Sequence, residues 1–303
     1  MIADAVVLMS VYAILTLALN LSLGMAGLFN LGLAGFFAIG AYGTGLLAIA
    51  GWPFPAVLAA DLVLGAAAGL LLAFPSLRLR GDYLAIVALG FGQLTETVLN
   101  SWDGLTGGAN GLDNIPAPGA FAHVSGPVGA AVFALALLAV AVAVTEGLRR
   151  SPYGQLLGAV RDDEVLVQAL GKSPHTAKVT ALMLSGALSA LGGAAYAYAI
   201  SYVDPGLADF QTSVYVFLAL LFGGMGSTWG SVVGGAGLVA VMEALQLVNL
   251  PTSVTGPAQE AFFALSLILL TLWRPQGVVA PAGAGRRAGA ALPATAAEVA
   301  EDA

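Results

Sequence analysis

Apolar stretches of about twenty residues follow one another along most of the chain, the length at which a helix spans the hydrocarbon core of a bilayer. Strands of an outer-membrane barrel would instead give segments of about ten residues with alternating polarity. The pattern predicts an all-α polytopic membrane protein with about nine transmembrane helices. The expected crossings are 5–23, 31–50, 54–74, 83–99, 128–147, 178–200, 212–224, 231–249 and 258–273.

Glycine-rich breaks divide two of the apolar stretches into helix pairs. As one helix, 5–50 would be about 69 Å long, so the glycines within 24–35 must turn the chain around. The stretch 212–249 also forms two helices, hinged at 223–230, because the basic residues flanking it share a side only after an even number of crossings. The related strings Gly24-Met-Ala-Gly27 and Gly224-Met-Gly226 mark the two breaks. Such a repeat is expected beside a translocation site, although chance in a chain with 40 Gly explains the likeness equally well.

Small residues also recur at helical spacing within single crossings. The string 65–69 has glycine at both ends, and the sixth expected crossing has a ridge of small side chains. Such positions let helix backbones approach closely, so they predict helix packing and not a binding face. The ridge consists of Ser185, Ser189, Gly193 and Ala197.

Charge sets the expected orientation. Charged residues make up 9% of the chain and hydrophobic residues 59%, which leaves too little polar surface for a soluble globule. All 10 Lys and Arg lie within 78–80, 149–178 and 274–287, which we place on the cytoplasmic side. Three crossings precede the first basic stretch, so we expect the N-terminus outside and the C-terminus inside. With no basic residue before it, the first apolar stretch is interpreted as a spanning helix and not a cleaved signal.

The two longest connections are expected on opposite sides. The outer segment 100–127 has no basic residue and is predicted to cap the outer mouth. In the inner segment 149–178, Ser151 and Ser173 each precede a proline, as at a helix start, and Gly171 is a helix stop. With the apolar turns between them, these signals predict a docking helix for a cytoplasmic partner, the alternative being a solvated loop.

The chain is predicted to form one transmembrane permease domain, 1–277. Residues 149–178 form its cytoplasmic coupling loop. Residues 278–303 are rich in Ala, Gly and Pro, which predicts a disordered cytoplasmic tail.

Residues suited to catalysis or metal binding are few. The string Gly171-Lys-Ser lacks the glycine that a phosphate-binding loop needs five positions earlier, where Leu166 stands. The two His, at 123 and 175, fall in separate loops, and there are no Cys. The net charge of -7 argues against a nucleic-acid partner. We expect a non-catalytic chain with no cofactor and no metal.

Polar residues at membrane depth are the candidate pathway residues. The acids Asp61, Glu96 and Glu243 are expected toward the outer ends of their helices, within reach of water. Gln93, Glu96 and Asn100 fall on one face of the fourth crossing, which indicates a water-accessible cavity shared with a partner permease or, alternatively, an interior hydrogen-bond network. The complete candidate set is Gln93, Glu96, Asn100, Asn20, Asn30, Gly224 and Gly226.

Five strings in order resemble the LivM family, and the resemblance covers 11–277. That family comprises membrane permease subunits of bacterial ABC importers for branched-chain amino acids. The strings are LRLRGDYLAIVALGFG at 77–92, LTGGANGL at 105–112, RSPYG at 150–154 continuing to RDDE at 161–164, FGGMGS at 222–227 and RPQG at 274–277.

The resemblance implies a multi-pass permease in the bacterial inner (cytoplasmic) membrane. The implied partners are two ABC ATPase subunits, a second homologous permease of the LivH type and an extracytoplasmic substrate-binding protein, beside the lipid bilayer. It also implies that the inner loop is the ATPase coupling segment. Its candidate residues are Arg161, Asp162, Asp163, Glu164, Ala169 and Gly171.

The chain departs from the family pattern at two places. Related chains commonly have small residues where this one has Val165-Leu-Val167, and often His where it has Leu33. Similar permeases resemble urea or short-chain amide transporters, so the substrate stays open. Two other classes also stay open, an ion-coupled secondary transporter working through Glu96 or Glu243 and a channel-like or structural protein. The organised inner loop favours the ABC permease, because a secondary carrier needs no docking helix.

Overall fold

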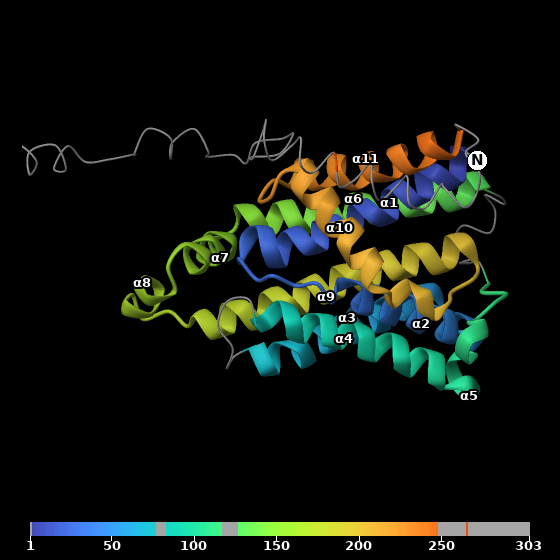
Figure 1. The fold of residues 1–303 in the computed structure, drawn as a ribbon, viewed down its shortest axis with the longest axis horizontal. Helices are drawn as coiled ribbons and strands as arrows, with labels where there is room; N and C mark the ends of the chain where they lie inside the picture. The colour runs from blue at the N-terminus through green and yellow to red at the C-terminus, as the bar shows by residue number, and fades with distance from the viewer. Residues whose placement is uncertain (1, 77–82, 117–126, 248–264, 266–303) are drawn as a thin grey trace, which may run out of the picture.

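The long helices lie side by side in an elongated bundle (Figure 1). The computed structural model describes residues 2–76, 83–116, 127–247 and 265, and every regular element in that part is helical. An isolated antiparallel bridge joins Leu112 to Val203. The predicted all-α class is therefore confirmed for these residues. Several expectations fall outside them, namely the crossing 258–273, the tail 278–303, the basic stretches 78–80 and 274–287, and His123.

Among the described residues, four helices are long and apolar enough to cross a membrane. They are α1 with its π-helical end η1 (Ile2–Leu19 and Asn20–Met25), α3 (Phe54–Ser76), α6 (Pro127–Arg150) and α9 (Pro174–Ile200). The shorter apolar helices are α2 (Leu33–Ile49), α10 (Phe210–Gly223) and α11 (Thr228–Leu247). The less apolar α4 (Tyr83–Ser101) contains the polar stripe formed by Gln93, Glu96 and Asn100. As far as residue 247, one of these helices overlaps each of the first eight expected crossings.

α9 packs against α1, α2, α3 and α6, and glycine brings their backbones together. A Cβ at Gly65 of α3 would lie 2.4 Å from the carbonyl oxygen of Gly186, and one at Gly40 of α2 would lie 2.3 Å from the Cα of Ala190. No side chain fits at such distances, so these glycines set the helix separation. The predicted packing ridge is confirmed, because all four of its members are buried: Ser185, Ser189, Gly193 and Ala197.

The first glycine-rich break is confirmed, and it holds an extended segment as well as a turn. α1 passes into the π-helix η1, which ends at Met25, and α2 begins only at Leu33. Residues 26–32 between them run back along the bundle without helical structure (Figure 1). As α2 has 17 residues, it is about 26 Å long, shorter than a bilayer core. If 31–50 spans the bilayer as expected, the segment before α2 has to supply the rest of the length.

The second break, between α10 and α11, is also confirmed. α10 ends at Gly223 and α11 begins at Thr228, with positive φ angles of 110° at Gly224 and 82° at Gly226 between them. Ahead of α10, residues 201–209 lead back from the end of α9. They include the 3-10 helix η3 (Pro205–Ala208), which packs against α2 and α4. α10, like α2, is therefore a short helix that follows a non-helical segment.

The two long connections lie at opposite ends of the bundle (Figure 1). At one end are α5 (Asp103–Thr106) and the 3-10 helix η2 (Gly108–Asn110). At the other are α7 (Pro152–Asp162) and α8 (Glu164–Ala169). The predicted helix signals are confirmed, since Ser151 and Ser173 cap α7 and α9 with proline following, and Gly171 has a φ of 74° after α8.

The expectation that Asp61 lies within reach of water is wrong. Its side chain is fully buried in α3, and the hydroxyl of Thr44 on α2 donates to Oδ2. The other carboxyl oxygen has no partner among the described residues. Hydropathy alone cannot find this site, because it does not tell which side of α3 faces α2.

Candidate functional site

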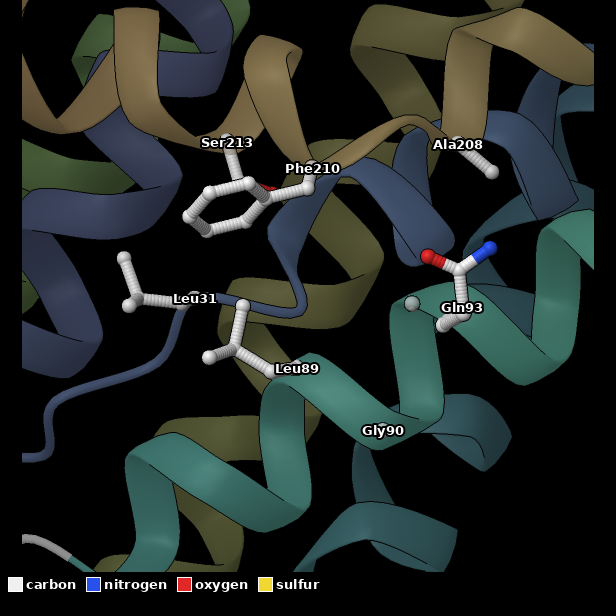
Figure 2. A pocket seen from close by; sticks show the side chains of 8 residues that line it. Leu31, Leu89, Gly90, Gln93, Ala208, Phe210 and Ser213 are labelled. Atoms are coloured by element: carbon white, nitrogen blue, oxygen red, sulfur yellow. The ribbon is translucent and has the colours of Figure 1, made fainter.

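A cavity of about 330 Å³ opens where the segment 26–32 meets α4 and the start of α10. Figure 2 shows the side chains of Leu31, Leu89 and Phe210 gathered on one side of it, with the amide of Gln93 near Ala208 on the other. Each of three chain regions that are distant in sequence supplies part of the wall. The lining residues are Leu31, Leu89, Gly90, Gly92, Gln93, Ala208, Phe210 and Ser213.

A hydrogen bond between α2 and α10 lies beside this cavity. The backbone N–H of Ala34, in the first turn of α2, donates to the hydroxyl of Ser213 in the first turn of α10 at 3.1 Å. Asn30 is buried and accepts from the N–H of Gly32 at 3.0 Å, which shapes the end of the extended segment. The two short helices therefore start beside each other at the cavity wall.

The lining of the cavity suits the binding of an apolar group better than it suits catalysis. Its lining is mostly aliphatic and aromatic, with Gln93 and Ser213 as the polar side chains and none that is charged. Within the described residues, no group of three or more His, Asp or Glu side chains is placed to hold a metal ion. The arrangement can receive a small apolar side chain, while Gln93 and Ser213 offer hydrogen bonds at its edge.

The polar stripe on α4 continues from this cavity. Gln93 donates to Glu96 at 3.0 Å, and Gln93 and Asn100 are exposed on the same face. The predicted helical spacing is therefore present. Thr97 also belongs to this exposed face and was missed. Of the predicted pathway residues, Gln93 lines the cavity and Asn30 shapes the segment next to it.

Two other predicted pathway residues, Asn20 and Gly226, lie at a separate place, where the two glycine breaks meet. Asn20 is fully buried in η1, and its Oδ1 accepts from the backbone N–H of Gly226 at 2.7 Å. A Cβ at Gly24 would lie 2.8 Å from the nitrogen of Gly226. Asn20 and Gly226 thus join the breaks to each other, and neither they nor Gly224 line the cavity.

Glu146, near the end of α6, also binds the second break and was missed by sequence reasoning. Its carboxylate accepts from the hydroxyl of Thr228 at 2.8 Å, and it forms ion pairs with Arg149 at 2.6 Å and Arg150 at 2.7 Å. An acid followed by arginines three and four residues later, at the end of an apolar span, is the signal that was available. The start of α11 is therefore anchored to α6.

The inner segment has a buried and an exposed side. Val167 of α8 is buried, whereas Val165, Leu166 and Leu170 are 74%, 59% and 72% exposed. An apolar surface of this kind on a loop between helices is typical of a protein contact. The segment 165–170 therefore presents large apolar side chains to the surroundings.

The predicted coupling residues have distinct structural roles. Asp163 caps α8 by accepting from the N–H groups of Val165 and Leu166. Glu164 pairs with Lys178 on α9. Arg161 donates from Nη1 to the carbonyl oxygen of Gly24. All six members are exposed, namely Arg161, Asp162, Asp163, Glu164, Ala169 and Gly171.

Comparisons with known proteins point in one direction. Residues 1–280 match the protein family described as "Branched-chain amino acid transport system / permease component". The chain is 35% identical to the high-affinity branched-chain amino acid transport system permease protein LivM of Escherichia coli K12, over 91% of this chain and 69% of that protein. Identity to the protein of the same name from Salmonella typhimurium is 34% over the same shares. A probable LivM permease of Methanocaldococcus jannaschii is 25% identical over 72% of this chain and 65% of its own. No solved structure matches.

Proposed function

This chain belongs to the family of branched-chain amino acid transport permease components, and on that premise we propose that it forms part of the membrane path of an ABC importer. The cargo is a branched-chain, hydrophobic amino acid moving into the cytoplasm. ATP is hydrolysed on separate subunits, and the chain itself is non-catalytic. The observation that carries this proposal is the family match over nearly the whole chain, together with an apolar cavity between two interrupted helices.

The cavity is proposed as the place where the substrate side chain passes. Leu31, Leu89 and Phe210 supply apolar contact for an isopropyl or isobutyl group. Urea or a short-chain amide needs hydrogen-bond partners over most of its surface, which this lining does not offer. The lining therefore favours a branched-chain amino acid over the amide alternative.

Partners are proposed from the surfaces that the fold presents. Val165, Leu166 and Leu170 suit an apolar groove on an ATPase subunit, and a complete importer has two such subunits. The polar face of α4 suits a second, homologous permease that shares an aqueous path. An extracytoplasmic binding protein would deliver substrate at the end where α5 lies. The complex would reside in the bacterial inner membrane.

Transport should depend on the partner ATPases. Proteoliposomes with this chain, its homologous permease, the ATPase subunits and the binding protein should accumulate leucine only with ATP, since the inner segment is built for docking and no nucleotide site is expected in this chain. Uptake of radiolabelled leucine gives the measurement. Vesicles without the ATPases serve as the control. If this chain alone concentrates leucine using a proton or Na⁺ gradient, the secondary-carrier alternative replaces our proposal.

The proposed orientation has about nine crossings, with the N-terminus outside and the C-terminus inside. Single cysteines at Ala109 and Gln155 should then be labelled from opposite sides of the membrane, because both positions are exposed and lie at opposite ends of the bundle. The chain has no Cys, so the background is clean. Labelling with an impermeant maleimide in intact and lysed cells distinguishes the sides. Modification of both positions in intact cells would contradict the orientation.

A further inference from the structure

Arg161 connects the inner segment to the break between α1 and α2. It is in the last turn of α7, and its Nη1 donates to the carbonyl oxygen of Gly24, 137 positions away in the chain. Its aliphatic stem lies against Gly27, where an added Cβ would be 2.9 Å from Cγ of Arg161. The φ of 71° at Gly27 further disfavours a side chain there. The contact therefore depends on both a guanidinium and a glycine.

The chain leads directly from this contact to the cavity. η1 ends at Met25, so carbonyl groups near its end are left without regular helical partners, and a charged donor is a strong substitute. The extended segment 26–32 then begins beside Arg161 and reaches Leu31, which lines the cavity. At its far end, Gly32 lies against α4, where a Cβ would be 2.3 Å from the carbonyl oxygen of Ala88. Because residues 26–32 contain no helix, they form one continuous non-helical connection between the contact with Arg161 and the cavity.

The inner segment is also attached to α9, and α7 packs against α6. The hydroxyl of Tyr153 on α7 donates to the carbonyl oxygen of Ala177 at 3.0 Å, and Glu164 of α8 pairs with Lys178. Burial raises the pKa of Tyr153, and the hydrogen bond to Thr180 opposes this shift. Because the pKa is raised, the hydroxyl stays protonated and can donate. α9 is packed tightly in the bundle, so these contacts hold the segment in place. Arg161 instead joins it to a non-helical part of the chain.

We propose that Arg161 is a positioning residue that transmits movement of the docked inner segment to residues 26–32 and so sets the position of Leu31 at the cavity. This rests on the proposed function, because it presupposes an ATPase docked on α7 and α8. It assigns the guanidinium of the exposed Arg161 to a contact with the carbonyl oxygen of Gly24, whereas sequence reasoning grouped Arg161 with the ATPase contacts. In this proposal the exposed apolar side chains of α8 contact the ATPase, and Arg161 transmits the resulting movement to Gly24.

The first experiment measures leucine taken up per ATP hydrolysed by the complete reconstituted importer. Arg161→Met keeps the aliphatic stem and loses the donors, so this ratio should fall roughly tenfold, as expected for loss of a hydrogen bond with a charged partner. Arg161→Lys keeps a charged donor and should recover part of the ratio. Lys172→Met is the matched control, because it removes a positive charge from an exposed position beyond α8 and should leave the ratio at the parent value.

The second experiment follows Leu31 itself. With Leu31→Cys in this Cys-free chain, the rate of thiol labelling should differ between the resting complex and the complex trapped with ATP and vanadate. Adding Arg161→Met should abolish that difference. A purely structural role would instead lower the amount of complex and leave the labelling difference in the surviving molecules.

Each outcome decides the proposal. An unchanged ratio in Arg161→Met overturns it, and so does a labelling rate in the Leu31→Cys variant that never responds to trapping. Loss of ATPase from purified Arg161→Met and Arg161→Lys complexes also overturns it, since Arg161 would then belong to the docking surface. Failure of the proposed function looks different, because the parent complex itself would show no ATP-dependent uptake.

Discussion

Replacing Gly90 with phenylalanine should lower leucine uptake roughly tenfold or more, because a bulky group then occupies the cavity. Gly90 lines the cavity, and a Cβ built there meets no heavy atom within 4 Å outside its own turn of helix. The new side chain therefore has room to enter the cavity without disturbing α4. Gly90→Ala, Gly90→Val and Gly90→Phe should form a graded series, with leucine affected before the smaller valine. Initial uptake rates in proteoliposomes provide the measurement.

Gly147→Phe is the matched control for this series. Gly147 is an exposed helical glycine on α6 with equally open space at its Cβ, but it does not line the cavity. Both variants should purify with the partner permease in parental amounts, which separates blockage from failed assembly. Parental leucine uptake by correctly assembled Gly90→Phe would remove the cavity from the transport path.

Leu166→Arg should weaken ATPase binding and lower ATP-driven uptake with it. Leu166 is 59% exposed between Val165 and the buried Val167, so it is an accessible anchor for a docked subunit. An arginine buried in an apolar groove without a partner costs on the order of 2 kcal/mol or more, which weakens association about thirtyfold. Membrane insertion should be unaffected, since the position faces water. Co-purification of the ATPase with tagged permease measures the effect.

Leu105→Arg is the corresponding control at the other end of the bundle. Leu105 of α5 is also an exposed leucine, 44% accessible, and should retain the ATPase fully. A Leu166→Arg complex that keeps its ATPase at parental stoichiometry would show that docking lies elsewhere.

Sequence patterns predicted the helices well, because apolar length and glycine or proline punctuation are local properties. Ser151 and Ser173 were correctly expected as caps, and the breaks before Leu33 and after Gly223 lie where chain length required them. The spacing of Gln93 and Glu96 on one helix face was also a local matter.

Contacts between distant residues could not be predicted in this way. Asn20 and Gly226 were predicted separately, and sequence did not show that the N–H of Gly226 donates to Asn20 across 206 positions. Asp61 was expected near water and is fully buried. Arg161 was assigned to an external contact, and its guanidinium donates to the carbonyl oxygen of Gly24. Each result depends on which helices become neighbours, and a single sequence read for periodicity does not contain that information.

The extended segment 26–32 has a consequence for how the protein is made. Backbone N–H and C=O groups outside a helix are not tolerated against lipid, so this segment needs protein around it. Its shield includes Ala88 of α4, and the helix that follows is bound to Ser213 of α10, which leaves the ribosome much later. The first half of the chain therefore cannot reach its final arrangement during its own synthesis. The hydrogen bond from Ala34 to Ser213 can form only once α10 has been synthesised.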